Sequence, residues 1–422
     1  MPIIRKECFK LFTAFTEVNM KKEFLVSILL LVSAASRVFG VTAFTGYAGG
    51  KLNQGANEQA DDYEGELKLQ AFFAGQFNFN QNVWSHLEFS IDTDNLLTDE
   101  IFKKTPAQFR IDELSITGKM TFTGIVNYLS AFIGMYDPIG SDILLQRYFG
   151  IEGIASKVTD SWLGTGNSIL YPQWGIGVAD VLKSYTLPTL IGLYAYVNSE
   201  DPEYKVFNID LRGALSFHYF TMDLAAGLGA PLADKSQGKD VIVAINKLYW
   251  HMGTTLLIGN NYTAASLFSQ LGINNASIEP KANTMAVSPE TCYFLIEPRF
   301  YNGVGHTHVS LYILPKNTVS ELMILDDTMG INLNIFQNVN TRNNLFTIGM
   351  HFGAGFDDKY IDDLLPPDSF NISDLHAYVI PYFSTNILAG SLNTALKIKF
   401  HEFVNKKPGK AFVIDLGYKC KL

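Results

Sequence analysis

Charged side chains recur at two-residue spacing in several segments of this 422-residue sequence. In an extended strand, residues two apart lie on the same face, so each series would form a charged row. A charged row along a water-filled passage can select solutes by their charge. The residues that we assign to such rows are Glu64, Glu66, Lys68, Glu88, Arg110, Asp112, Asp210, Arg212, Lys397 and Lys399.

Two of these series join opposite charges. Arg110 lies two residues from Asp112, and Arg212 lies two residues from Asp210. Each pair could line a passage and act on solutes, or could form a salt bridge that neutralises itself in the wall. The sequence leaves both interpretations open.

The sequence lacks the motifs that carry hydrolytic or nucleotide chemistry. No H-E-x-x-H, G-x-S-x-G or P-loop pattern occurs, and Gly227-Leu228-Gly229 is only a fragment of a dinucleotide fingerprint. We therefore predict that the protein is not an enzyme and has no cofactor. The net charge of −9 also argues against binding nucleic acid through phosphate contacts.

Three groups could be considered as metal ligands. His306 and His308 share one face of a predicted strand but have no evident third ligand. The acidic groups Asp92-Thr93-Asp94 and Asp357, Asp358, Asp362 and Asp363 could bind Ca²⁺, or could be solvated loop residues. We assign no metal site.

Apolar and polar residues alternate along much of the chain. In Tyr63–Phe79 the odd positions are apolar or glycine, and most even positions are polar. A turn at Asn80-Gln81-Asn82 leads to a second alternating segment from Val83 to Ile91, which predicts a hairpin with matched faces. The final residues, Phe412–Leu422, alternate in the same way up to the end of the sequence.

Further segments of this kind occur throughout the sequence. They are Thr189–Val197, Phe207–Phe217, Val309–Leu314, Met329–Ile335, Leu345–Phe352, Leu375–Phe383 and Leu392–Phe400. Long connections (52–62, 93–107, 137–167 and 354–373) alternate with short ones (80–82 and 388–390). Such asymmetry is typical of membrane barrels with short periplasmic turns and long external loops. We predict an all-β fold, a transmembrane antiparallel β-barrel of about 16–18 strands.

Two architectures use strands with one apolar face. A soluble sandwich turns that face inward, whereas a membrane barrel turns it outward to lipid and keeps a polar interior. Aromatic residues near the strand ends, as in an interfacial girdle, favour the barrel. On this basis Leu396 should face lipid.

Residues 1–40 have the pattern of a secretory signal peptide. Met20 is an alternative start, Lys21 and Lys22 form a positive region, and a short apolar stretch follows. Cleavage before Val41 would leave residues 41–422 as the barrel. The mature chain would then reach the bacterial outer membrane after crossing the inner one.

The last eight residues resemble the C-terminal assembly signal of bacterial outer-membrane β-barrels. Asp415, Gly417, Cys420 and Leu422 occupy its places, with Tyr418 between them, although Leu422 replaces the usual terminal aromatic residue. The segments Phe109–Leu114 and Phe132–Pro138 are similar to early strands of substrate-selective porins. The resemblance to the porin class implies outer-membrane lipid and the barrel assembly machinery as partners. It makes a homotrimer one possible assembly, and the sequence leaves the oligomeric state open.

The connection 137–160 is the one that could control a passage. It contains Asp137, Asp142 and Arg147 beside an apolar stretch, Ile143–Leu145. It could fold inward as a constriction, or cap the barrel from outside.

The favoured function is passive or facilitated diffusion of small solutes through a porin-type channel. The acidic composition mildly favours cations or neutral solutes. A transporter of hydrophobic molecules, such as long-chain fatty acids, is an alternative that rests on the apolar segments Leu96-Leu97, Ile143–Leu145 and Ala264–Leu271. A surface adhesin or structural barrel is a second alternative.

Overall fold

The computed structural model describes most of the chain from Ala43 to Leu422. The described residues are 43–56, 64–97, 107–151, 154–159, 174–198, 205–232, 248–260, 262–279, 284–286, 291–319, 322–340, 345–356 and 374–422. The predicted signal peptide at residues 1–40 and the acidic group at 357–363 lie outside these ranges. No helix among the described residues is long and apolar enough to cross a membrane.

Nineteen strands join into one antiparallel sheet within these ranges. The first nine are β1 (Ala43–Ala56), β2 (Gly65–Asn78), β3 (Val83–Thr93), β4 (Ala107–Phe122), β5 (Ile125–Met135), β6 (Trp174–Ser184), β7 (Thr189–Asn198), β8 (Val206–Phe217) and β9 (Phe220–Pro231). The others are β10 (Leu248–Ile258), β11 (Ala265–Glu279), β12 (Thr284–Ala286), β13 (Cys292–Tyr301), β14 (Gly305–Ile313), β15 (Met329–Asn340), β16 (Leu345–Phe356), β17 (His376–Ile387), β18 (Gly390–Lys399) and β19 (Phe412–Lys421). Short helices are α3 (Ile143–Phe149), α4 (Lys316–Val319), α5 (Phe400–Val404) and the 3-10 turn η5 (Pro408–Lys410).

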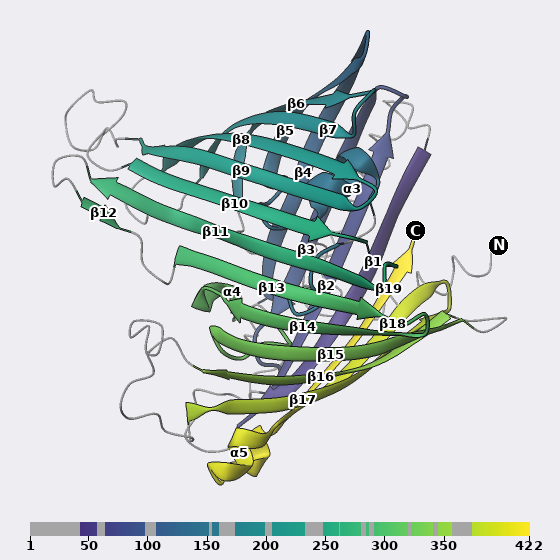
Figure 1. Ribbon diagram of the computed structural model, residues 1–422, viewed down its shortest axis with the longest axis vertical. Coiled ribbons are helices and arrows are strands. Elements are labelled where there is room, and N and C mark those ends of the chain that lie inside the picture. Colours follow the sequence, from purple (N-terminus) through teal and green to yellow (C-terminus); the bar gives the residue numbers. More distant parts are fainter. Residues whose placement is uncertain are drawn as a thin grey trace.

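The sheet closes on itself. β1 pairs with β2 on one side and with β19 on the other, in a register that runs from Tyr47↔Lys421 to Gln54↔Ile414. β12 pairs only with β11 among the described strands, so the remaining eighteen strands form the barrel. Figure 1 shows β1, in purple, beside β19, in yellow. The predicted barrel is confirmed, at the upper end of the expected strand count.

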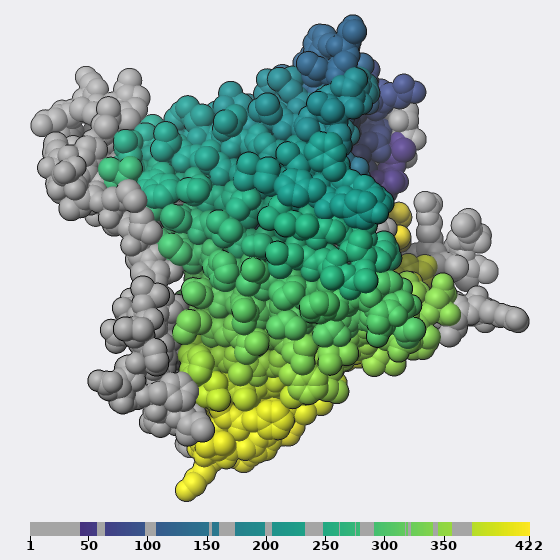
Figure 2. All heavy atoms as spheres, in the orientation of Figure 1, coloured from purple at the N-terminus to yellow at the C-terminus, as the bar shows by residue number. Residues whose placement is uncertain are grey.

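The apolar face of each barrel strand points outward. On β8, Leu211 is 57% exposed, while its neighbours Asp210 and Arg212 are each 2% exposed. The same holds on β19, where Ile414 and Leu416 are exposed and Asp415 is buried. Figure 2 shows the outside of the wall that the teal and green strands form as a continuous surface. This pattern matches a membrane barrel and is opposite to that of a soluble sandwich.

Exposed aromatic residues gather near both ends of the strands. Phe122, Tyr185, Phe217 and Tyr219 lie at or beside the short turns. At the end with the long connections, Phe109, Trp174 and Phe207 lie near strand termini. Two such belts are typical of the interfaces of a bilayer.

Strand β1 was missed by the sequence analysis, which assigned residues 52–62 to a long loop. β1 extends to Ala56, and its outward positions include Gly46, Ala48 and Gly50. Small residues in place of large apolar ones weaken the alternation on which the prediction depended. The interpretation of Ala264–Leu271 as an apolar loop is also wrong, because β11 begins at Ala265.

Tyrosine rings on the inner wall lie across glycines of neighbouring strands. Gly353 is opposite Tyr378, and Gly349 is opposite Tyr382. A Cβ atom at either glycine would lie 2.0–2.2 Å from the Cζ atom of the facing ring. The two glycines therefore let these rings lie flat against the wall.

Candidate functional site

The inner face of the barrel follows from the strand register, because paired residues of neighbouring strands share a face. All but one of the ten charged residues predicted to line a passage lie on this face. These are Glu66, Lys68, Glu88, Arg110, Asp112, Asp210, Arg212, Lys397 and Lys399. Glu64 is exposed and lies one residue before β2.

Asp210 and Arg212 each have partners on other elements of the barrel. Asp210 lies 3.0 Å from Nε2 of His251 on β10 and accepts a hydrogen bond of 2.9 Å from Tyr196. The guanidinium group of Arg212 pairs with Asp223 and also donates to the carbonyl oxygen of Asp137. Both residues are buried in the wall and tie it together.

Gly227, part of the fragment seen in the sequence, has a packing role beside this pair. A Cβ atom there would lie 2.1 Å from Asp210 Oδ1 and 2.2 Å from His251 Nε2. Glycine at this place makes room for the contact between the two side chains.

The connection after β5 enters the barrel. We call residues 136–151 and 154–159 the first inward segment. Asp137 accepts hydrogen bonds from Arg147 (2.7 Å) and from Tyr194 on β7 (2.9 Å). Arg147, on α3, also donates to Glu113 on β4 at 2.6 Å. Of the two interpretations left open by the sequence, the described residues support the inward fold.

Asp142 joins two parts of the first inward segment. It is the N-cap residue of α3, but its side chain makes no capping hydrogen bond to the helix. Its carboxylate instead accepts a hydrogen bond of 2.7 Å from the backbone nitrogen of Ala155. Leu144 and Leu145, from the apolar stretch seen in the sequence, are fully buried.

The rest of the first inward segment follows the inner wall as far as β17. Gln270 on β11 donates to the carbonyl oxygen of Gly140 at 2.6 Å. On β13, Arg299 donates to the carbonyl oxygen of Ile154 at 2.9 Å, and Glu297 accepts a hydrogen bond from Ser156. The ammonium group of Lys157 lies 4.4 Å from the ring centroid of Phe336 on β15 and 5.7 Å from that of Tyr382 on β17.

A second connection also folds against the inner wall, and the sequence gave no sign of it. We call residues 314–319 and 322–328 the second inward segment. Leu314, Ile324 and Leu325 are buried in the same apolar cluster as Leu144 and Leu145. Their spacing follows neither a strand nor a long helix, so periodicity could not reveal that they pack inside.

Lys397 and Lys399, predicted to line the passage, hold this second inward segment. Lys397 Nζ lies 2.6 Å from Asp326 Oδ1 and donates to the carbonyl oxygen of Met323 at 2.9 Å. Lys399 Nζ lies 3.6 Å from the same carboxylate oxygen. Burial by itself would raise the pKa of Asp326, but the two ammonium groups lower that pKa below its ordinary value.

The inner wall is not covered evenly. From β7 to β17 most inward side chains are fully buried, including Tyr194, Leu295, Tyr312 and Ile380. On β19 and β1–β4, which we call the open wall, many inward side chains keep part of their surface in water. Among them are Lys51, Lys68, Gln70, His86, Asp92, Arg110, Lys119 and Lys419.

A bulge in the open wall brings metal-ligating side chains together. The β3–β4 register shifts between Glu88 and Phe89, and both Asp112 and Glu113 on β4 are consequently buried. One ligand atom each from His86, Glu88 and Glu113 lie within 4.8 Å of one another. Both carboxylate oxygens of Glu113 are already engaged, one by Arg147 and one by Ser115. Glu113 is therefore already held by partners within the protein.

His306 and His308 do not combine with a third ligand among the described residues. The ring of His306 stacks between Tyr301 and Phe336, with both centroid distances at 4.6 Å. His308 lies 3.4 Å from the carboxylate of Glu297. Both imidazoles thus have neighbouring side chains in the wall.

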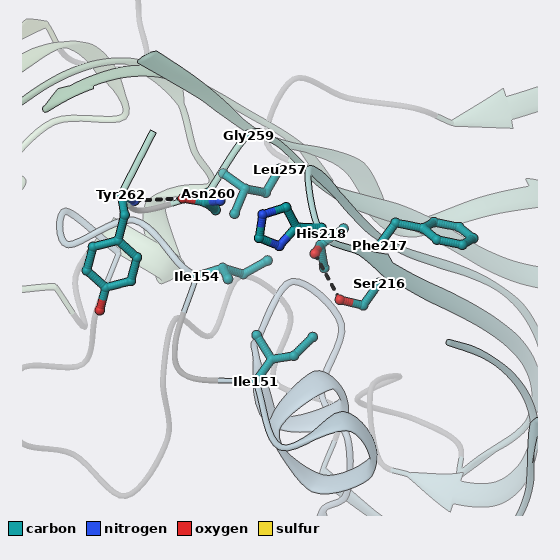
Figure 3. Close-up of a pocket in the computed structure, with 10 residues that line it drawn as sticks. Ile151, Ile154, Ser216, Phe217, His218, Leu257, Gly259, Asn260 and Tyr262 are labelled. Carbon is teal, nitrogen blue, oxygen red and sulfur yellow. Dashed lines mark hydrogen bonds between the residues drawn. The ribbon is translucent and has the colours of Figure 1, made fainter. Parts of the chain in front are cut away.

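A cavity of about 340 Å³ opens at the short-turn end, between the first inward segment and the wall. Figure 3 shows the side chains of Ile154, Leu257 and His218 converging there, with Ser216 on one side. The hydroxyl group of Ser216 lies 3.2 Å from that of Thr221, which also lines the cavity. Its lining mixes apolar and polar groups. The sequence analysis missed this cavity, because its lining residues come from one connection and from the surroundings of two separate turns.

The residues of the predicted assembly signal end the last strand. Gly417 is inward and buried, Leu422 is exposed, and Tyr418 donates a hydrogen bond of 2.8 Å to the carbonyl oxygen of Leu388. Their recognition by assembly machinery remains a prediction.

No protein-family model matches the sequence, and no curated protein is significantly similar to it. Among solved structures, a triple mutant of Rhodopseudomonas blastica porin is 12% identical, with a TM-score of 0.42, over 90% of this chain and 99% of that one. A double mutant of the same porin is 9% identical, with a TM-score of 0.41 and the same coverage. Salmonella typhi OmpF in complex with daunomycin is 10% identical, with a TM-score of 0.38, over 90% and 97% of the two chains. At these values the assignment of the barrel rests on the strand pairing of this chain itself.

Proposed function

We propose that this chain forms a channel in a bacterial outer membrane, through which small solutes diffuse passively or with facilitation. One observation carries the proposal: the closed barrel is apolar outside and charged inside. An apolar outer band suits lipid, and a polar interior suits water and dissolved solutes.

The two inward segments support a narrowed passage rather than a wide one. Barrels of about 16–18 strands leave an aqueous lumen unless loops fill it. The first inward segment lies along the wall from β4 to β17, and the second is held by β17 and β18. The remaining route would follow the open wall, where side chains keep contact with water.

This route gives the predicted pore-lining residues different roles. Glu66, Lys68 and Arg110 belong to the open wall and would meet solutes. Glu88 and Asp112 belong to the same wall but are buried, and would act through their partners. Asp210, Arg212, Lys397 and Lys399 would act on the passage indirectly, by fixing the wall and the inward segments. Asp137, Asp142 and Arg147 would set its width.

Single-channel conductance of the refolded mature protein, from Val41, in a planar bilayer tests the proposal. Stable steps of uniform size that scale with salt concentration are expected. A folded, heat-modifiable barrel without steps would contradict an open channel. Chemical crosslinking of the same sample would test the homotrimer that the porin resemblance suggests.

A transporter of hydrophobic molecules is the second candidate. The cavity at the short-turn end favours it, because Ile151, Ile154 and Leu257 supply apolar surface there. Lipid extracted with the purified barrel, and identified by mass spectrometry, would support it. Absence of bound lipid together with regular conductance steps would favour the diffusion channel.

A further inference from the structure

The open wall carries a diagonal row of three lysines on adjacent strands. Lys68 on β2 pairs with Asn53 on β1, and Lys51 lies two residues from Asn53 on the same inner face. Lys51 in turn pairs with Gly417 on β19, and Lys419 lies two residues further. Diagonal neighbours of this kind are about 7–8 Å apart. We call Lys68, Lys51 and Lys419 the lysine track.

The cations of the open wall are consistently closer to water than their acidic partners. Lys51 lies 3.3 Å from Asp415, and the two side chains are 19% and 0% exposed. Lys68 lies 2.8 Å from Glu66, with exposures of 51% and 24%. Arg110 lies 2.6 Å from Asp112, with exposures of 48% and 3%. In each pair the carboxylate is set back in the wall and the cation faces the lumen.

Two further acid–base pairs that involve the open wall have the same orientation. Arg147 is more exposed than Glu113, and His86 is more exposed than Glu88. The ammonium group of Lys419 lies 3.6 Å from the ring centroid of Tyr47, on the inner face. A solute at this wall would therefore meet ammonium and guanidinium groups first.

We propose that the open wall is a track for small anions, which makes the channel anion-selective although the chain carries a net charge of −9. This inference rests on the proposed channel function. Charges that line a narrow passage with low-dielectric walls act on a permeating ion far more strongly than charges in distant loops. The net charge of the whole chain, from which the sequence analysis favoured cations, gives the charges in distant loops the same weight as those that line the passage.

The experiment is the reversal potential of the mature protein in a planar bilayer under a KCl gradient. Chloride should permeate more readily than potassium. The triple variant Lys51→Gln, Lys68→Gln, Lys419→Gln should lower the chloride-to-potassium permeability ratio several-fold. A matched variant, Lys205→Gln, Lys406→Gln, Lys407→Gln, removes the same charge from exposed connections and should leave the ratio nearly unchanged.

The outcomes separate the two proposals. Conductance steps with a preference for potassium, or with a ratio that the triple variant leaves unchanged, would overturn the anion track and leave the channel intact. Absence of any steps would overturn the channel, and the track with it. If the triple variant does not refold, Lys68→Gln alone, at the most exposed track position, gives the same test with a smaller expected shift.

Discussion

Arg147 joins two separate parts of the protein through one guanidinium group. It contacts Asp137 within its own segment and Glu113 on β4, and its own side chain is largely buried. Both carboxylates would lose their cationic partner if this residue were replaced. Removing one partner of a buried ion pair costs more than the pair contributes, because the other charge is left uncompensated.

Arg147→Gln should therefore destabilise the first inward segment. We expect a loss of about 2–4 kcal/mol in unfolding free energy, since some exposure reduces the full cost of a buried pair. The single-channel conductance should rise and become noisier as the segment loosens. Lys68→Gln is the control: it removes the same charge from a pair with Glu66 whose side chains are 51% and 24% exposed, and it should cost less than about 1 kcal/mol. Equal losses in the two variants would contradict the bridging role of Arg147.

Asp326 gives the second inward segment a defined dependence on pH. Burial would raise its pKa, but Lys397 and Lys399 lower it below the ordinary value of 3.8. A carboxyl group whose pKa is lower in the folded state stabilises that state above its unfolded pKa. This stabilisation is lost as the pH falls through the folded pKa.

The stability difference between the natural protein and Asp326→Asn should thus be constant above about pH 4–5 and shrink below it. Urea unfolding at a series of pH values measures that difference. A difference that did not shrink on acidification would contradict the stabilising role of the ionised Asp326 carboxylate.

At the scale of elements, each strand separates lipid-facing from inward residues by a single position. Leu211 is the outward neighbour of the buried Arg212. Leu211→Arg should cost about 2–4 kcal/mol near the middle of the bilayer. Leu97→Arg, at a similarly exposed leucine after β3, should cost almost nothing. Guanidinium unfolding from lipid vesicles compares the two, and a tolerated arginine at Leu211 would refute the assignment of faces.

The sequence predicts the strands far better than it predicts the contacts of the segments that fold inside the barrel. Alternation identified β2, β3, β7, β8 and the strands from β14 to β19, because lipid on one side and water or polar groups on the other impose a strict period of two. It failed for β1, whose outward face is built from small residues. The inward position of Lys397 was predicted from this alternation, but its contact with Asp326 joins residues 71 positions apart and leaves no local pattern.

At the scale of the whole molecule, the barrel depends on the pairing of its first and last strands. The register between β1 and β19 covers eight residue pairs, from Tyr47↔Lys421 to Gln54↔Ile414. A chain that ends at Ile414 would retain one of them. Its β1 and β18 edges would be left with unpaired backbone groups, which is prohibitive in lipid.

Deletion of residues 415–422 should therefore abolish the heat-modifiable barrel on gel electrophoresis, even when the chain is refolded in detergent without other proteins. Deletion of Leu422 alone removes a single hydrogen bond, to the carbonyl oxygen of Gly46, and should leave the barrel folded. A compact barrel from the longer deletion would show that the seam is dispensable.

The flat tyrosines on the inner wall couple the spacing of two strands to the packing of the inward segments. Tyr378 and Tyr382 lie across Gly353 and Gly349, where no side chain holds the rings away from the backbone. Both rings are buried in the apolar cluster that the inward segments share, so a methyl group at either glycine would press its ring against packed side chains. Glycine-to-alanine exchanges along β16 should therefore displace the inward segments, and would change the passage only through them.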